Sequence, residues 1–190
     1  MDIPWGSEAA FKFVTNVGLI TSDGPHGPNV MAAEWTHHIS YSPGLIAVCF
    51  GANRTTLDNI RAAKKFGISL AASDQNLISS VAGTTKGKEI DKISALKELG
   101  FKFYEGKSGI LMVNGAALNA ECRVVEEIQL GDHTMVVGEV IELKIGDKEP
   151  IAYHQGKYGM LDTNVQKPSN AESEKISAII ESHRKKIVVK

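Results

Sequence analysis

One segment, residues 29–56, constrains the fold of this chain more than any other. It reads NVMAAEWTHHISYSPGLIAVCFGANRTT. Residues 30–40 form an extended pattern, and Ser42, Pro43 and Gly44 form a turn. Residues 45–50 are a continuous apolar run, which is typical of a buried strand. A short loop and a helix start follow, so we expect strand, turn, strand and helix N-terminus in quick succession.

The end of this segment has the features of a phosphate site. Thr55 and Asp58 make a near capping box, which predicts a helix that begins there with Thr55 as its cap. The first N–H groups of a helix lack partners and the helix dipole is positive at that end, so both favour a phosphate. The guanidinium group of Arg54 can bind phosphate oxygens in a bidentate way, and Thr55 and Thr56 can donate hydroxyl hydrogen bonds. The alternative is that Arg54 is a solvated surface arginine and Thr55 only a cap.

The beginning of the segment suits a flat ring. Ala32 and Ala33 leave the backbone accessible beside the large ring of Trp35. Backbone N–H and C=O groups commonly bind the polar edges of small ligands. The alternative is an ordinary strand whose small residues pack in a core. A ring at one end and a phosphate at the other describe a ligand such as flavin mononucleotide (FMN).

Composition excludes several classes of protein. The chain has 190 residues, 43% of them hydrophobic and 23% charged, which is typical of a globular domain with appendages. A net charge of −1 gives no electrostatic reason to expect nucleic acid or an anionic membrane surface as a partner. No apolar run approaches the roughly 18 residues of a membrane span, and the first residues do not resemble a signal peptide. We therefore expect a cytoplasmic protein.

The cysteines and histidines do not form a recognisable framework. Cys49 and Cys122 are too few for a disulfide scaffold, and both lie in strand-like runs as small buried residues would. Cys49 could also lie near a bound ring, because it belongs to the central segment. There is no CxxC pair, and the six histidines are not spaced as a metal motif, so we expect no metal site.

The rest of the chain predicts many strands and a few short helices. Without regular βαβ units, and with no GxGxxG after the first strand, a Rossmann domain is not expected. The pattern predicts a mainly β protein, an antiparallel barrel with peripheral helices. Glu121 and Glu142 would face solvent under simple alternation. The predicted helices cover residues 7–14, 56–65, 76–82 and 90–99, and further strands cover 17–21, 66–72, 109–130 and 134–145.

The C-terminal part differs in composition. Residues 150–161 mix aromatics with glycine and should pack back on the body. Residues 166–170 form a polar linker, and residues 171–186 form a charged helix with Ile176, Ile179 and Ile180 on one face. That stripe needs a partner surface. We divide the chain into a domain of residues 1–165 and a linker with C-terminal helix of residues 166–190.

Several motifs, taken in order, resemble the flavin reductase-like family with its FMN-binding split β-barrel, an antiparallel Greek-key fold. The closest likeness is to ferric reductase and flavoredoxin-like members, from about Phe13 to Tyr158. The motifs are NVMAAEW from Asn29, SYSPG from Ser40, NRTTLDNI from Asn53, AGTTKGKEIDK from Ala82 and GDHTMVVGEV from Gly131. Each motif is weak alone, and their order and spacing carry the resemblance.

The resemblance implies FMN near the interface of a homodimer. The ring would rest against residues 29–33 and be flanked by residues 49–51, and the phosphate would lie at residues 54–56. His133 resembles a family histidine near the site where nicotinamide or a second ligand approaches; on its own, a turn histidine bonded to the backbone is the favoured interpretation. His154 and Tyr158 resemble tail residues that reach the flavin. The implied cofactor-binding residues are Asn29, Val30, Met31, Ala32, Ala33, Cys49, Phe50, Gly51, Arg54, Thr55, Thr56, Ala82, Gly83, Lys88, His133 and Tyr158.

Two details of the motifs bear on affinity. Many relatives have serine or threonine near Ala33, so alanine here leaves only backbone contacts to the flavin. Lys88 belongs to the second cofactor-contacting loop of the resemblance, although lysines in a loop, as Lys86 and Lys88 are, are commonly only solvated.

The main functional hypothesis is a reductase in which NAD(P)H reduces bound FMN, which then reduces free flavin or ferric iron. The cofactor performs the chemistry, so no side chain is assigned as acid, base or nucleophile. One alternative is an electron-transfer flavoprotein that is reduced by a protein partner. Another is a dimeric binding module without flavin.

Overall fold

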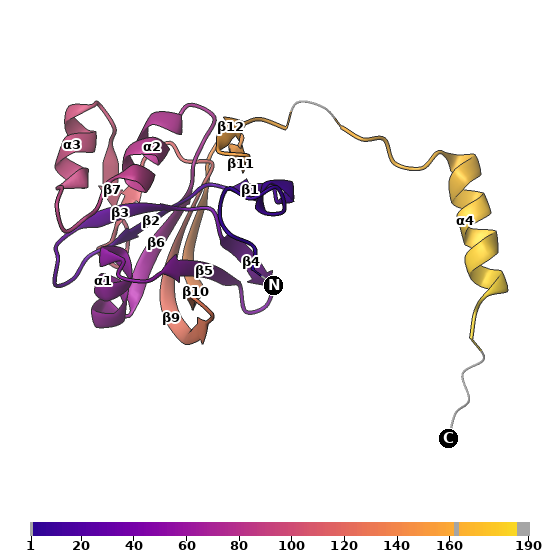
Figure 1. Cartoon of the computed structure of the whole chain (residues 1–190), viewed down its shortest axis with the longest axis horizontal. Helices are drawn as coiled ribbons and strands as arrows, with labels where there is room; N and C mark the ends of the chain where they lie inside the picture. The colour runs from indigo at the N-terminus through magenta and orange to yellow at the C-terminus, as the bar shows by residue number, and fades with distance from the viewer. Residues whose placement is uncertain (1, 162–163, 186–190) are drawn as a thin grey trace, which may run out of the picture. The chain divides into compact units, whose positions relative to one another are not determined.

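The structure, a computed structural model, describes residues 2–161 and 164–185 and divides into two compact units, residues 1–160 and 161–190. The first unit holds all the strands and three of the α-helices (Figure 1). Its elements are the 3-10 helix Ala10–Lys12, β1 (Thr15–Asn16), β2 (Gly18–Ser22), β3 (Asn29–Ala33), β4 (Thr36–Ser40), β5 (Leu45–Gly51), α1 (Thr55–Ala63), β6 (Lys65–Leu70), α2 (Asn76–Thr84), α3 (Lys92–Glu98), β7 (Phe103–Glu105), β8 (Leu111–Val113), β9 (Leu118–Leu130), β10 (His133–Ile145), β11 (Ala152–His154) and β12 (Lys157–Gly159).

An antiparallel sheet of seven strands, in the order β3-β2-β6-β9-β10-β5-β4, dominates this unit. Strands β3 and β4 are separated by only two residues, yet they lie at opposite edges of the sheet, so the sheet must roll until its edges meet. Two observations support this approach: Asn16 Nδ2 donates to the Thr36 carbonyl at 2.6 Å, and a Cβ on Gly18 of β2 would collide with Thr36 Oγ1 of β4. The expected mainly β fold with peripheral helices is confirmed.

The same closure corrects one prediction. Residues 30–40 are not one strand, because the chain leaves the first edge at Glu34 and Trp35 and continues as β4 at the other edge. Thr36 Oγ1 donates to the Ala33 carbonyl at 3.1 Å and holds this corner. The strand-like sequence pattern continues on both sides of the corner, so the local sequence contains no signal that the strand ends there.

Two hydrophobic clusters hold the first unit together. One lies between β3 and the helices α2 and α3, and includes Val30, Ile78, Ala82 and Leu96. The other lies between the sheet and α1 and includes residues such as Phe50, Ile60 and Phe66. Burial of this apolar surface is the main stabilising contribution to the fold. The two clusters also fix α1 and α2 relative to β3.

The helix α1 begins at Thr55 as expected, but the expected cap is wrong. The N-cap residue is Arg54, and no side chain caps the helix. Thr55 and Thr56 are therefore the first helical residues, and both are buried. The Asp58 side chain does not return to the cap; it pairs with side chains of other segments, as described below.

The long hairpin of β9 and β10 corrects the expectation for Glu121. Ala120 and Cys122 lie in the core, so Glu121 does point to the opposite face of the sheet, but the loop between β7 and β8 covers it there. Glu121 is 4% exposed and accepts hydrogen bonds from the backbone N–H groups of Lys107 and Ser108, each at 2.7 Å. Glu142 stays partly exposed and pairs with Lys107.

Both ends of the first unit are built from short elements. The expected helix over residues 7–14 is only the 3-10 turn Ala10–Lys12, in which no residue is buried, so it lacks an apolar face to stabilise it. The N-cap is Ala9 and not Ser7 as expected, although Ser7 Oγ does accept from Ala10 N at 3.2 Å. Residues 150–161 do pack back on the body, because β11 pairs with β1 and β12.

The second unit contains α4 (Asn170–Ser182). A capping box starts the helix: Ser169 Oγ accepts from Glu172 N at 3.3 Å, and Glu172 accepts from Ser169 N at 2.8 Å. The expected helix over residues 171–186 is confirmed to Ser182, and residue 186 lies outside the described residues. Its isoleucine stripe is exposed within the described chain.

Candidate functional site

The N-terminus of α1 lies against the start of β3. Asn29 Nδ2 donates to Thr56 Oγ1 at 2.8 Å, and both side chains are buried. Because no side chain caps α1, its first backbone N–H groups are free to bind an anion. Arg54 is exposed at the same point. The predicted phosphate-binding residues Arg54, Thr55 and Thr56 therefore lie next to Asn29, which the sequence predicts at the ring end of the ligand.

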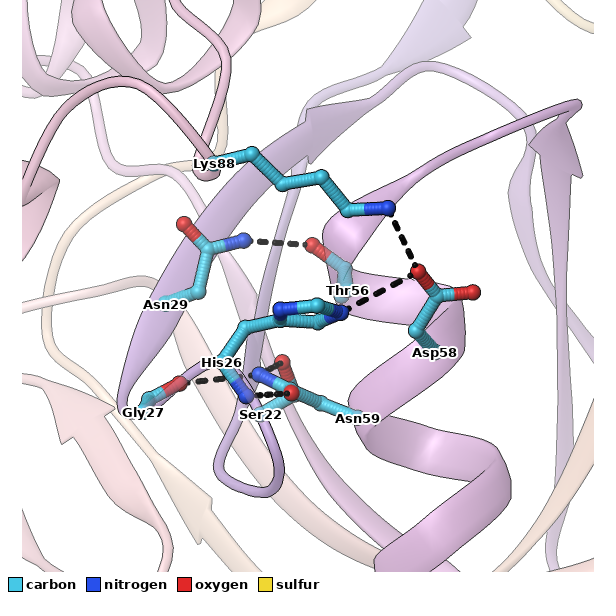
Figure 2. A network of polar contacts seen from close by, with 8 residues as sticks. All are labelled: Ser22, His26, Gly27, Asn29, Thr56, Asp58, Asn59 and Lys88. Carbon is cyan, nitrogen blue, oxygen red and sulfur yellow. Dashed lines mark hydrogen bonds and ion pairs between the residues drawn. The ribbon is translucent and has the colours of Figure 1, made fainter.

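Asp58, on the first turn of α1, contacts a lysine and a histidine from other segments (Figure 2). Its carboxylate pairs with Lys88 Nζ at 3.0 Å and with His26 Nε2 at 3.3 Å. The hydrogen bond from Lys88, with a smaller contribution from His26, holds the pKa of Asp58 below its ordinary value. The predicted site residue Lys88 thus does reach α1, and it is an ion-pair partner and not a freely solvated lysine.

Asn59 fastens the loop between β2 and β3 to the same helix. Its Nδ2 donates to the Gly27 carbonyl at 2.8 Å, and its Oδ1 accepts from His26 N at 3.1 Å. Figure 2 shows this amide below the Asp58 cluster, between the loop and α1. Two independent contacts therefore fix the loop that carries His26, and with it the start of β3.

The remainder of β3 forms a wall with α2. The side chains of Val30, Ala33 and Ala82 are buried in the core, and those of Met31 and Ala32 are half-buried. Gly83 approaches Ala32 so closely that a Cβ on Gly83 would lie 3.4 Å from the Ala32 Cβ. A ligand at this wall would meet the backbone and small side chains, which agrees with the expectation of backbone contacts to a ring.

Gly51 lies between two polar side chains at the end of β5. A Cβ at Gly51 would lie 3.6 Å from His133 Nε2 and 3.7 Å from Arg54 Nε, so His133 and Arg54 flank one point. The His133 Nδ1 contacts Asp132 at 2.8 Å, which leaves Nε2 for a ligand. The ring of His133 packs against Trp35, with centroids 4.5 Å apart.

The other members of the predicted set occupy less direct positions. The Phe50 side chain is fully buried in the core, so only its backbone can face a ligand. Burial raises the pKa of the Cys49 thiol, which is thus neutral near pH 7. Tyr158 stacks near Tyr153, with ring centroids 5.6 Å apart, and Tyr153 packs on the cluster that contains Val30. His154 is exposed at the end of β11.

FMN fits the chemistry of these residues. The uncapped helix start, Arg54 and the threonine hydroxyls suit its phosphate. Asn29 Oδ1 is a buried acceptor without a partner among the described residues, and a ligand that carries hydroxyl and N–H donors could satisfy it. Gly87 packs directly over this amide, since a Cβ there would lie 2.5 Å from Asn29 Oδ1.

Comparison with known proteins decides the family. Residues 10–162 match the family described as Flavin reductase like domain. The chain belongs to the flavin reductase-like family. An uncharacterised protein of Archaeoglobus fulgidus is 34% identical over 142 residues, which are 73% of this chain and 75% of that protein.

Relatives with assigned activities agree with the family. The ferric-chelate reductase (NAD(P)H) of Archaeoglobus fulgidus is 26% identical over 149 residues, 77% of this chain and 85% of that protein. The solved structure of flavin reductase PheA2 matches with a TM-score of 0.72 at 29% identity, over 86% of this chain and 100% of that one. This member of the flavin reductase-like family is therefore an oxidoreductase of the reductase type.

Two further features bear on the class of protein. Within residues 2–161 and 164–185, no three histidine, cysteine or acidic side chains cluster as metal ligands would. None of the helices described combines the length and the apolar character needed to cross a membrane.

Sequence reasoning missed three residues of this region. His26 lay in a turn-rich stretch, and Asp58 was read only as a cap partner. Lys92 fell within the predicted helix over residues 90–99 and was given no role, yet it is 3% exposed. Its spacing from Leu96 places it on the apolar stripe of α3, and that was the available signal.

Proposed function

We propose that this protein binds FMN and uses NAD(P)H to reduce it, with free flavin or ferric iron as the electron acceptor. The observation that carries the proposal is the uncapped start of α1, with Arg54 exposed beside it and Asn29 bonded to Thr56. The names of relatives, one a flavin reductase and one a ferric-chelate reductase, support this class of reaction.

In this proposal, each part of the site has a distinct task. Arg54, Thr55 and Thr56 hold the phosphate together with the helix N-terminus. Backbone groups of residues 29–33 and 82–83 orient the ring. His133 presents Nε2 at Gly51, where it can donate or accept a hydrogen bond to a second ligand. When bound, the flavin would accept a hydride and pass its two electrons on singly or as a pair, and the protein would supply binding and orientation.

We also propose a homodimer located in the cytoplasm. Ile141, Leu143 and Ile145 occupy alternate positions of β10 and are each about half or more exposed in the single chain, which favours a partner surface. Cys49 and Cys122 are both free thiols, as is usual in a reducing compartment. The proposed flavin site lies close to this interface.

Anaerobic addition of NAD(P)H to the FMN-loaded protein tests the reaction. The flavin absorbance should bleach on mixing and return when ferric citrate or free flavin is added. If dithionite bleaches the bound flavin and NAD(P)H does not, the protein is an electron carrier that depends on a partner. If the protein binds no added FMN, the proposed function is wrong.

A further inference from the structure

Lys92 is a buried cation at the back of the proposed flavin site. Its ammonium donates to the Val30 carbonyl of β3 at 3.1 Å and to the Ala82 carbonyl of α2 at 3.0 Å. The side chain is only 3% exposed. One lysine from α3 therefore joins the edge strand of the sheet to the last turn of α2, the two elements that form the wall described above.

The two carbonyls have few other partners available. β3 is the edge strand of the sheet, so one side of its backbone has no neighbouring strand. Ala82 lies in the last turn of α2, where helix carbonyls lack intrahelical partners and a cation is favourable. Lys92 satisfies both groups at once, and its loss would leave two buried acceptors unpaired.

The charge of Lys92 has no counter-ion among the described residues. The sequences of β3 (NVMAA) and α2 (NLISSVAGT) contain no charged residue. The neighbouring carboxylate of Asp91 is exposed and accepts from Ser94 N, and that of Asp58 is paired with Lys88 and His26. The charged group that acts electrostatically on Lys92 is Arg54, which is a second cation. A buried lysine is rare without a partner of opposite charge, so this arrangement calls for an anion.

We propose that Lys92 is a positioning residue of the flavin site, whose ammonium fixes β3 against α2 and whose charge is balanced by the anion that binds beside Arg54. The inference rests on the proposed function, because it concerns the same site. Lys92 acts on the ligand through the two carbonyls and through its electric field, without contacting the reacting atoms.

The proposed role of Lys92 couples ligand binding to proton uptake. Burial, together with the charge of Arg54, lowers the pKa of Lys92 to about 8. An anion at Arg54 favours the charged form of Lys92, so binding raises its pKa. Near that pH, part of the free protein lacks this proton and must take it up when the anion binds. By linkage, the affinity for FMN falls as the pH rises through this range.

Calorimetry of FMN binding near pH 8 measures the uptake directly, with titrations in Tris and in HEPES, two buffers with different ionisation enthalpies. The wild-type protein should take up a fraction of a proton per FMN, and its affinity should weaken from about pH 7 to about pH 9. Lys92→Arg keeps the charge and the donors but does not titrate in this range, so its uptake should vanish and its affinity should stay constant with pH. Lys92→Met should bind FMN at least about tenfold more weakly.

Lys97→Met is the matched control, because Lys97 is exposed on the same helix and should leave uptake and affinity at wild-type values. Proton uptake in Lys92→Arg equal to that of the wild type would overturn the inference, even if Lys92→Met does not fold. So would wild-type affinity in a folded Lys92→Met protein. Failure of the wild-type protein to bind FMN at all would instead reject the proposed function.

Discussion

At the scale of single residues, Glu121 shows how a carboxylate can be buried without a cation. Its two oxygens accept from the backbone N–H groups of Lys107 and Ser108, and the Ser108 hydroxyl donates to it as well. Burial alone would raise the pKa of Glu121, but these hydrogen bonds outweigh burial and hold the pKa below its ordinary value of 4.5. The carboxylate thereby fixes the loop between β7 and β8.

Glu121→Gln should lower the free energy of unfolding by about 1–3 kcal/mol at pH 7, because an amide cannot accept all three bonds and brings an unsatisfied donor. The depressed pKa of the folded state means that Glu121 stabilises the protein fully above pH 4.5 and loses this contribution as the pH falls through its folded value. Urea unfolding at pH 7 and at about pH 3 measures this. The free energy of unfolding should change less between these two pH values for Glu121→Gln than for the wild type.

Glu142→Gln is the control for Glu121→Gln. Glu142 faces Glu121 across the β9–β10 ladder and is partly exposed, where its pair with Lys107 contributes little. Its substitution should change the free energy of unfolding by less than about 0.5 kcal/mol. An equal effect of the two substitutions would show that burial of Glu121 does not matter for stability.

At the scale of elements, α1 carries two arginines with different surroundings. Arg61 is bound to Glu127 of β9, with its Nε at 2.7 Å from the carboxylate. Arg54 forms no ion pair with any residue that the structure describes. An arginine at an uncapped helix start is suited to an external anion, so the proposal assigns ligand binding to Arg54 and a structural role to Arg61.

Arg54→Ala should weaken FMN binding by about tenfold or more, because loss of a charge-assisted hydrogen bond costs about 1.5–3 kcal/mol. Quenching of flavin fluorescence on titration with protein would measure the dissociation constant. Arg61→Ala removes the same side chain from the same helix and should leave that constant unchanged. The assignment of the phosphate to this helix end fails if both variants bind FMN as tightly as the wild type.

Elements set by local signals were predictable from the sequence, and those set by distant contacts were not. The run over residues 45–50 became β5, and α1 does begin at Thr55, although the capping box from which that start was predicted does not form. The corner at Glu34 and Trp35 depends on closure of the sheet by strands far along the chain, so the local pattern does not record it.

The candidate site divides in the same way. Arg54, Thr55 and Thr56 are adjacent in the chain, and their grouping was readable. Lys88 follows α2 in the chain, yet it pairs with Asp58 of α1. Likewise, Lys92 of α3 bonds to the backbone of β3. Such pairings require the tertiary arrangement, because a charged residue in a polar stretch carries no sign of its partner.

At the scale of the whole molecule, the single chain leaves apolar surface uncovered on its long hairpin. Leu143 and Ile145 alternate along β10, so their side chains point to one side of the strand, and Ile141 lies just before them at the register shift. Their exposure within the described chain is 49%, 51% and 75%. Contiguous apolar surface of this kind usually marks an interface, and a second copy of the chain is the partner proposed above.

Leu143→Lys should weaken the proposed homodimer and shift the protein towards a monomer. A two-fold interface contains each substitution twice, and each buried leucine contributes about 1.5–3 kcal/mol, so the dimer dissociation constant should rise by a factor of about ten or more. Light scattering coupled to size-exclusion chromatography measures the mass. Glu126→Lys, which adds a lysine at an exposed position of β9, should stay dimeric.

The same variant also tests whether the flavin site depends on the partner. If the interface borders the site, the Leu143→Lys monomer should bind FMN more weakly than the wild type at equal protein concentration, while its circular dichroism stays unchanged. Dilution of the wild type below its dimer dissociation constant should produce the same loss of affinity, since both routes remove the partner. A folded monomer with wild-type affinity would place the whole flavin site within one chain and separate it from the exposed face of β10.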